Sequence, residues 1–248
     1  MNDVLVRLRE SAVSTVSQTP YSAMVGAFVN DAKREVEDSW QWSHIMDYLT
    51  FTTTAGLSSY ETNTMLTRYA APPLNYPNGA GERARLWQDN VTGDALLLNV
   101  TLNFESRLTY QPVLTDQIIK QKILNQPTQE LGPPSVWQLA QSTFFAAPGM
   151  WNKAVLLYNL PDIAYTMQLF IVNPQDDLVA DGDVMKVPTA PVVQKAYLYC
   201  LYERGEELGE RMDLTVQKVE DTLSAAITLD QQLSQQFLAL SIPQGSQY

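Results

Sequence analysis

The chain has 248 residues, of which 45% are hydrophobic, with 27 acidic and 16 basic side chains and a formal net charge of −11. This length and this balance are typical of a folded chain with a sizeable core rather than of a disordered one. One histidine and one cysteine exclude an internal disulfide and the usual zinc sites. No secretion signal is recognisable, and no apolar run approaches the roughly 20 residues that cross a bilayer, so we expect no membrane partner.

The acidic charge is concentrated late in the chain. Up to Leu160 there are 14 acidic and 11 basic residues, a net of −3, whereas the remainder holds 13 and 5, a net of −8. The densest acidic run extends from Glu203 to Asp213. Because such a surface repels a phosphate backbone, it argues against sequence-specific binding of DNA or RNA. The simplest interpretation of the run is a solvated helix face.

Helical spacing of apolar residues marks the N-terminal end of the chain. Residues 4–12 predict a short helix, and residues 20–38 predict a second one with proline in its first turn. The apolar residues of the second helix form one face. Lys33 and Glu37 are expected on its polar side, in solvent.

The C-terminal end of the chain is also helical. Thr189 followed by Pro191 predicts the start of a third helix. Asp213 is the expected N-cap of a fourth, long amphipathic helix. Its apolar face is a row of residues three or four apart, namely Val219, Leu223, Ala226, Leu229, Leu233, Phe237 and Leu240.

The middle of the chain has the composition of β structure. β-branched and aromatic residues after Ile45 predict a first strand, and residues 153–160 and 164–172 predict two later ones. In the last of these, apolar side chains alternate as in a half-buried strand. Residues 71–81 predict a long loop and residues 113–124 a short helix. We expect the strands to form one small, mostly antiparallel sheet.

The order of helices, strands and helices predicts an α+β fold. In the expected arrangement the N- and C-terminal helices pack as a helical bundle, from which a central, mostly antiparallel β region projects. The predicted parts are a bundle of residues 1–40 and 189–240, a β-rich domain of residues 41–188, and a C-terminal tail of residues 241–248.

The side chains that could carry chemistry have simpler structural explanations. His44 follows two tryptophans, and no nucleophile motif accompanies it, so we expect it to be a polar partner at the edge of an aromatic cluster. Cys200 lies on the apolar side of its helix and is expected to be a buried thiol with a raised pKa. The sequence therefore predicts no catalytic residue and no cofactor.

Four carboxylates within eight residues form the best superficial metal candidate. They are Asp176, Asp177, Asp181 and Asp183, and oxygen ligands of this kind suit Ca²⁺ or Mg²⁺. The spacing and the closing glutamate of an EF-hand loop are missing. We therefore expect a solvated loop that caps the following helix, and we predict no metal site and no enzyme.

Two segments resemble a known family of viral proteins. The first runs from Glu37-Asp38-Ser39-Trp40-Gln41-Trp42 through a strand to the turn at residues 55–60. The second runs from Leu157-Tyr158-Asn159-Leu160-Pro161 through Asn173-Pro174 and Val187-Pro188 into the helix that begins near Pro191. In order and texture they resemble the head-to-tail adaptors of tailed bacteriophages, in particular the tail tubular protein A type of short-tailed phages. The resemblance covers about half of the residues and is weakest between Arg68 and Trp151.

This resemblance implies a virion structural protein of the phage neck, made in the cytoplasm of a bacterial host. Its partners would be the portal protein, a tail nozzle or other tail protein, and further copies of itself in a ring, usually of twelve. Genomic DNA would pass through the ring during ejection without sequence-specific binding.

Two groups of residues follow from this resemblance as candidates for function. Four glutamates are expected to face the channel, namely Glu203, Glu206, Glu207 and Glu210. The terminal peptide is expected to become ordered on the portal, and deleting it should weaken portal binding without unfolding the chain. Its residues are Ser241, Ile242, Pro243, Gln244, Gly245, Ser246, Gln247 and Tyr248.

The sequence leaves two other functions open. One is another neck or tail-completion protein of similar architecture. The other is a carboxylate-dependent hydrolase that acts from the acidic loop of residues 176–183.

Overall fold

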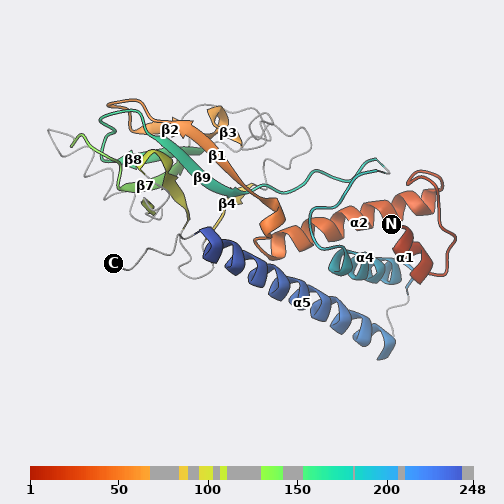
Figure 1. Ribbon diagram of the computed structural model, residues 1–248. Helices are drawn as coiled ribbons and strands as arrows, with labels where there is room; N and C mark the ends of the chain where they lie inside the picture. The colour runs from red at the N-terminus through yellow and green to blue at the C-terminus, as the bar shows by residue number, and fades with distance from the viewer. Residues whose placement is uncertain are drawn as a thin grey trace. The chain divides into compact units, whose positions relative to one another are not determined.

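A computed structural model divides the chain into two compact units of mixed α and β structure, which confirms the expected fold class (Figure 1). Met1–Ile45 and Asp177–Tyr248 form the helical unit, and Met46–Asp176 form the β unit. The structure describes residues 1–67, 84–88, 95–102, 107–110, 130–141, 153–180, 182–205 and 210–241. The expected loop at 71–81 and the expected helix at 113–124 lie outside these ranges.

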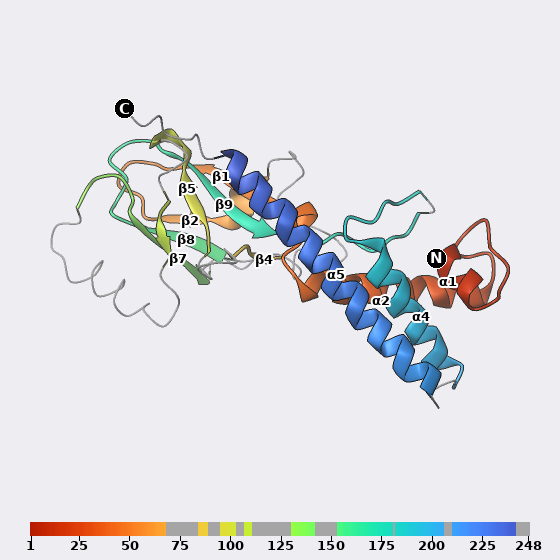
Figure 2. The same ribbon diagram turned by 60° about the horizontal axis from the view of Figure 1, so that its bottom comes forward.

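Four helices are described in the helical unit, and α4 contacts the other three (Figures 1 and 2). Within the described residues, no helix combines the length and the hydropathy needed to cross a membrane. The helices are α1 (Asn2–Arg7), α2 (Pro20–Ser39), α4 (Thr189–Glu203) and α5 (Glu210–Ser241).

Two helix boundaries differ from those expected. The first helix ends at Arg7 and does not reach residue 12, because the backbone at Arg9 takes a positive φ of 61°, which ends a right-handed helix. The last helix begins at Glu210, so Asp213 lies inside its first turn and is not the N-cap.

The start of α2 is held by a reciprocal cap. The Thr19 side chain accepts a hydrogen bond from the Ser22 backbone N–H at 3.0 Å, and the Ser22 hydroxyl accepts one from the Thr19 N–H at 3.0 Å. Pro20 at the first helical position has no N–H that needs a partner. The expected helix of residues 20–38 is therefore confirmed, with its end at Ser39.

The expectation that Lys33 and Glu37 lie in solvent on the polar side of α2 is wrong. Lys33 and Glu37 are both 0% exposed, and the Lys33 Nζ lies 3.1 Å from the Glu37 Oε1. They share the buried side of the helix with Val25, Val29 and Ala32. One turn apart on a helix, a lysine and a glutamate can neutralise each other, which allows both charges to leave water.

The strands of the β unit form two sheets rather than the single sheet expected. Within the described residues, the first sheet has the order β3-β1-β9-β4, with β5 also on β9, and the second has the order β2-β8-β7-β6. All pairs are antiparallel except β6 with β7. The bounds are β1 Met46–Thr52, β2 Ser59–Glu61, β3 Leu66–Thr67, β4 Arg85–Leu86, β5 Leu97–Asn99, β6 Thr109–Tyr110, β7 Val136–Gln141, β8 Lys153–Tyr158 and β9 Thr166–Val172.

The first and last strands of the β unit pair with each other along their whole length. β1 and β9 are antiparallel neighbours from the pair Met46 and Val172 to the pair Thr52 and Thr166. The alternation predicted for the last strand is confirmed, since Met167 and the other odd-numbered residues of β9 are buried. The two strands therefore form the middle of the first sheet.

Both sheets contribute to one core. Leu49 of β1 and Leu169 of β9 are fully buried, and Trp137 of β7 and Leu157 of β8 join them from the second sheet. No pattern in the sequence predicted β7, although its Trp137 contributes the largest side chain of this core. The Trp137 ring packs on Tyr110 with the ring centroids 4.8 Å apart.

The Lys33–Glu37 pair gives a stability prediction. We expect Lys33→Ala to lower the free energy of unfolding by about 3–5 kcal/mol, because it leaves the Glu37 carboxylate buried without its cation. The double change Lys33→Met with Glu37→Leu removes both charges at similar volume and should cost less than about 1 kcal/mol. Urea denaturation followed by circular dichroism measures both, and a double variant as unstable as the single one would contradict the explanation.

Candidate functional site

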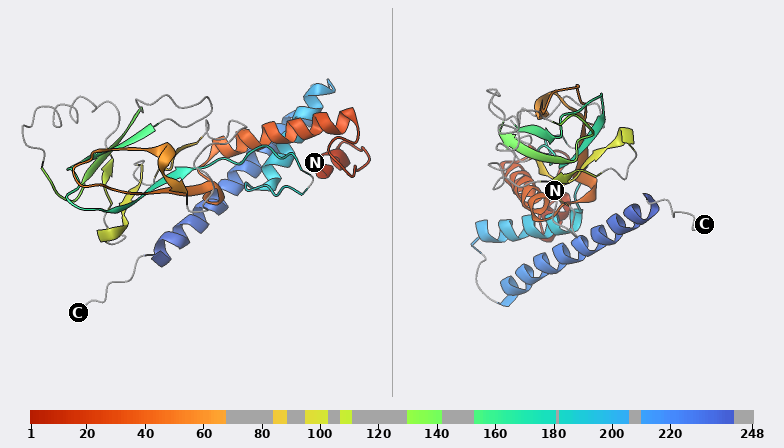
Figure 3. Two further views of the ribbon diagram at one scale, coloured as in Figure 1. Left: turned by 90° about the horizontal axis from the view of Figure 1, so that it is seen from above. Right: turned by 90° about the vertical axis from the view of Figure 1, so that its left-hand side faces the viewer.

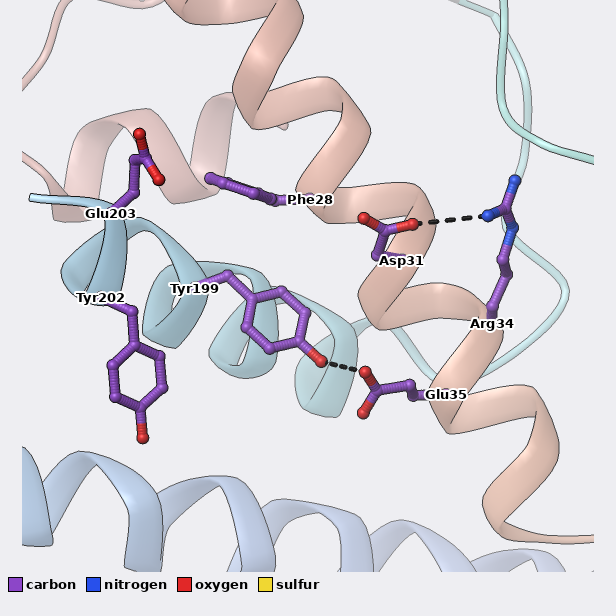
Figure 4. A pocket seen from close by; sticks show the side chains of 7 residues that line it. All are labelled: Phe28, Asp31, Arg34, Glu35, Tyr199, Tyr202 and Glu203. Carbon is purple, nitrogen blue, oxygen red and sulfur yellow. Dashed lines mark hydrogen bonds and ion pairs between the residues drawn. The ribbon is translucent and has the colours of Figure 1, made fainter.

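An open groove lies between α2 and α4, with a volume of about 570 Å³. Phe28, Asp31, Arg34 and Glu35 line it from α2, and Tyr199, Tyr202 and Glu203 line it from α4 (Figure 4). The rings of Phe28 and Tyr199 meet edge to face with their centroids 6.1 Å apart. The groove therefore joins aromatic faces with three carboxylates.

Glu35 is held by groups from the opposite helix. The Tyr199 hydroxyl donates to one of its oxygens, as Figure 4 shows, and Lys195 pairs with the other. Partial burial acts to raise the pKa of Glu35, but the hydrogen bonds from Lys195 and Tyr199 outweigh it and the pKa is lowered. Burial and the bond to Glu35 both raise the pKa of Tyr199. These contacts tie α2 to α4 and give each oxygen of the Glu35 carboxylate a partner.

Two arginines of the helical unit are also engaged within it. Arg34 makes a two-point contact to the carboxylate of Asp177, with its Nε 3.0 Å from Oδ1. Arg204 donates to Glu10 at 2.6 Å and to the Tyr21 hydroxyl at 2.9 Å. Because both arginines pair with carboxylates of the helical unit, their charges are not available to neutralise other acidic side chains of its surface.

Exposed carboxylates remain where α4 ends and α5 begins. Glu203 is exposed at the end of α4, and Asp213, Glu220 and Asp221 are exposed on α5. Among the described residues, no basic side chain forms an ion pair with any of these four. We name this set the acidic end of the helical unit.

The four predicted channel residues are described only in part. Glu203 is exposed, as a channel residue would need to be. Glu206, Glu207 and the side chain of Glu210 lie outside the described residues. Of the terminal peptide, Ser241 is the last residue of α5, and residues 242–248 lie outside the described ranges.

A buried carboxylate fastens α5 to the residues that follow α2. Asp230 is 5% exposed, and it accepts hydrogen bonds from the Trp40 Nε1 at 3.2 Å, the Ser43 N–H at 3.2 Å and the Ser43 hydroxyl at 2.6 Å. Its charge is thus met by three donors, which compensates for its removal from water. Asp230 interrupts the apolar row expected on this helix, and its role was not predicted.

His44 lies beside this carboxylate without completing a catalytic triad. Its Nδ1 is 3.2 Å from the Ser43 Oγ, and the ring is exposed. In a hydrolase triad the imidazole lies between the hydroxyl and the carboxylate. Here Ser43 lies between His44 and Asp230, so its proton points to the carboxylate. The set stabilises the turn after α2, and the expectation of a polar partner fits this geometry.

The carboxylates of the acidic loop are used to hold the loop itself. Asp177 binds Arg34, and the Asp183 Oδ2 accepts from the N–H groups of Val179 and Ala180, each at 2.7 Å. The loop does not cap α4 as expected, because the N-cap is Pro188 and no side chain caps the helix. Asp181 lies outside the described residues, within which no three metal-binding side chains gather.

Cys200 is buried on α4, as expected. The side chain is 0% exposed, and burial raises the pKa of its thiol to about 11. At neutral pH it is therefore a protonated, apolar group.

The predicted apolar face of α5 is covered for only part of its length. Val219 is buried, but Leu229 is 62% exposed and Leu233 is 46% exposed. With 32 residues against 15 in α4, α5 begins beside the end of α4, runs back along it and extends well beyond its start (Figures 2 and 3). Leu229 and Leu233 are therefore apolar side chains that the described part of the chain leaves in water.

Comparison with known proteins gives this chain no family. No family model matches the sequence, and no curated protein matches it. What supports a function is therefore the charge, exposure and contacts of its own residues.

The Asp230 contacts give a second stability prediction. Asp230→Ala leaves the Trp40 and Ser43 donors without their acceptor, and we expect it to lower the free energy of unfolding of the helical unit by about 3 kcal/mol. Asp221→Ala, at an exposed carboxylate on the same helix, should change it by less than about 0.5 kcal/mol. Thermal unfolding of both variants measures the difference, and equal effects would show that the Asp230 contacts do not hold α5.

Proposed function

We propose that this chain is a virion structural protein, a head-to-tail adaptor that forms a ring between the portal and the tail of a bacteriophage. In this proposal the helices of both chain ends form one bundle from which the β unit projects. The ring, of about twelve copies by resemblance to the phage adaptors, surrounds part of the channel through which the genome leaves the capsid. Its partners are the portal protein, a tail protein and the neighbouring copies.

The observation that carries this proposal is the acidic end of the helical unit. A channel for DNA must let a polyanion slide, so its wall has to avoid cations that would bind phosphates. Arg34, Lys195 and Arg204 are each engaged with carboxylates inside the unit, whereas Glu203 and Glu220 stay exposed without an ion pair. Lys218 is exposed on the same part of α5, so the surface is acidic on balance rather than free of cations. Such a surface fits the wall of a DNA path.

Assembly on a portal tests this proposal. The purified protein, mixed with the portal protein of the same phage, should form a ring of fixed stoichiometry on it. Mass photometry gives the stoichiometry, and negative-stain electron microscopy shows the ring. A monomer in the absence of the portal is compatible with the proposal, but a chain that stays monomeric in its presence contradicts it.

Charge reversal tests whether the acidic end lines the channel. In assembled rings, Glu203→Lys with Glu220→Lys should retain double-stranded DNA in about 50 mM salt, and raising the salt should release it, because each new phosphate contact releases a condensed counterion and higher salt opposes that release. A mobility-shift assay over a salt series measures this. Asp3→Lys with Glu130→Lys changes the net charge equally at exposed positions on α1 and in the β unit. If this control retains DNA as strongly, the acidic end does not face the channel.

A further inference from the structure

The charges of α5 are confined to its first part. Residues 210–221 include six charged side chains in twelve positions, whereas residues 222–241 include one in twenty, Asp230. That one is buried and bound to Trp40 and Ser43. The second part of the helix, which we name the neutral segment, therefore presents no charge to its surroundings.

The neutral segment is exposed in a way that an isolated helix does not favour. In residues 222–233, the part whose side chains the structure describes, Leu229 and Leu233 lie in solvent, and the other exposed positions are uncharged: Ser224, Ala225, Thr228 and Gln232. Solvated helix faces usually carry lysine and glutamate, and clustered exposed leucines mark contact surfaces. The neutral segment thus has the composition of a surface that becomes buried on assembly.

The net charge of the chain indicates what covers it. Each copy carries a net charge of −11, so two copies repel each other wherever their acidic surfaces approach within about 8–10 Å, the screening length in physiological salt. A basic partner would be attracted to the carboxylates of the acidic end. The uncharged neutral segment would offer it no electrostatic attraction. A second copy, in contrast, approaches at the lowest electrostatic cost where neither surface is charged.

We infer that the neutral segment of α5 is the contact between neighbouring copies of this chain. The inference rests on the proposed ring and specifies which surface closes it. Leu229 and Leu233 insert into the adjacent copy, and the uncharged side chains around them surround this apolar centre. Because a ring needs head-to-tail contacts, the surface that receives them lies elsewhere on the adjacent copy.

Two matched leucines on the same helix test this inference. Leu229 and Leu214 are each 62% exposed, but Leu214 lies in the charged part of α5. We expect Leu229→Glu to reduce ring formation on the portal by about tenfold or more, because it buries an unpaired carboxylate in the contact. Leu214→Glu should assemble like the wild type. Since both side chains are exposed, both variants should keep the wild-type melting temperature.

The outcomes separate this inference from the proposed function. Single copies of the Leu229→Glu variant bound to the portal without a closed ring support the contact between copies. A complete ring of that variant overturns the inference and leaves the adaptor proposal intact. Loss of all portal binding, even of single copies, assigns the neutral segment to the portal and also overturns it. If the wild type itself makes no ring, the adaptor proposal is wrong.

Thiol labelling gives an independent measurement. Leu229→Cys and Leu214→Cys introduce exposed thiols, while the native Cys200 is buried and protonated at neutral pH. A maleimide should label both introduced thiols in the free protein, and ring formation should slow labelling at position 229 at least about tenfold more than at position 214. Protection of position 229 in the free protein, or equal labelling of both positions in the ring, would contradict the inference.

Discussion

The packing of α4 is the constraint on which the helical unit depends. This helix contacts α1, α2 and α5, and it buries residues such as Val192, Ala196 and Cys200 in doing so. Few side chains of α4 carry charge: Lys195 is engaged with Glu35 of α2, as is the C-cap Arg204 with Glu10, whereas Glu203 at the end of the helix is exposed. The packing of this short helix thus brings together the ion pairs that join α4 and its C-cap to the preceding segments.

The same division separates two kinds of surface on one helix. The first part of α5 continues the exposed carboxylates that begin at Glu203, and the second part is neutral with exposed leucines. Asp230 lies within the second part, but its carboxylate is buried and accepts hydrogen bonds from Trp40 and Ser43. In the proposed ring, a wall that does not bind DNA and a contact between acidic copies would need these opposite properties, and α5 carries both along its length.

Local sequence patterns predicted those helices and strands that can be recognised without knowing which segment they pack against. The helix beginning at Pro20 follows from its cap and its spacing, and β9 follows from its alternation. Pairing was harder, because nothing local assigns β8 and β9 to different sheets or marks Val136–Gln141 as a strand. Among the candidate residues, the buried thiol of Cys200 was predictable from its helix face. Lys33 and Asp230 were not, because a buried charge depends on partners that the spacing of apolar residues does not reveal.

The way the chain enters and leaves the β unit has a consequence for its origin and for engineering. Met46 and Val172 are paired neighbours, so the ends of this long insertion are held side by side by the β1–β9 ladder. For the helical unit, closing the loop costs little more entropy than closing a hairpin would, whatever the insertion contains. The sequence of the β unit can therefore diverge, or the whole unit can be replaced by another insertion whose ends lie side by side, while the helices at either end keep their own contacts.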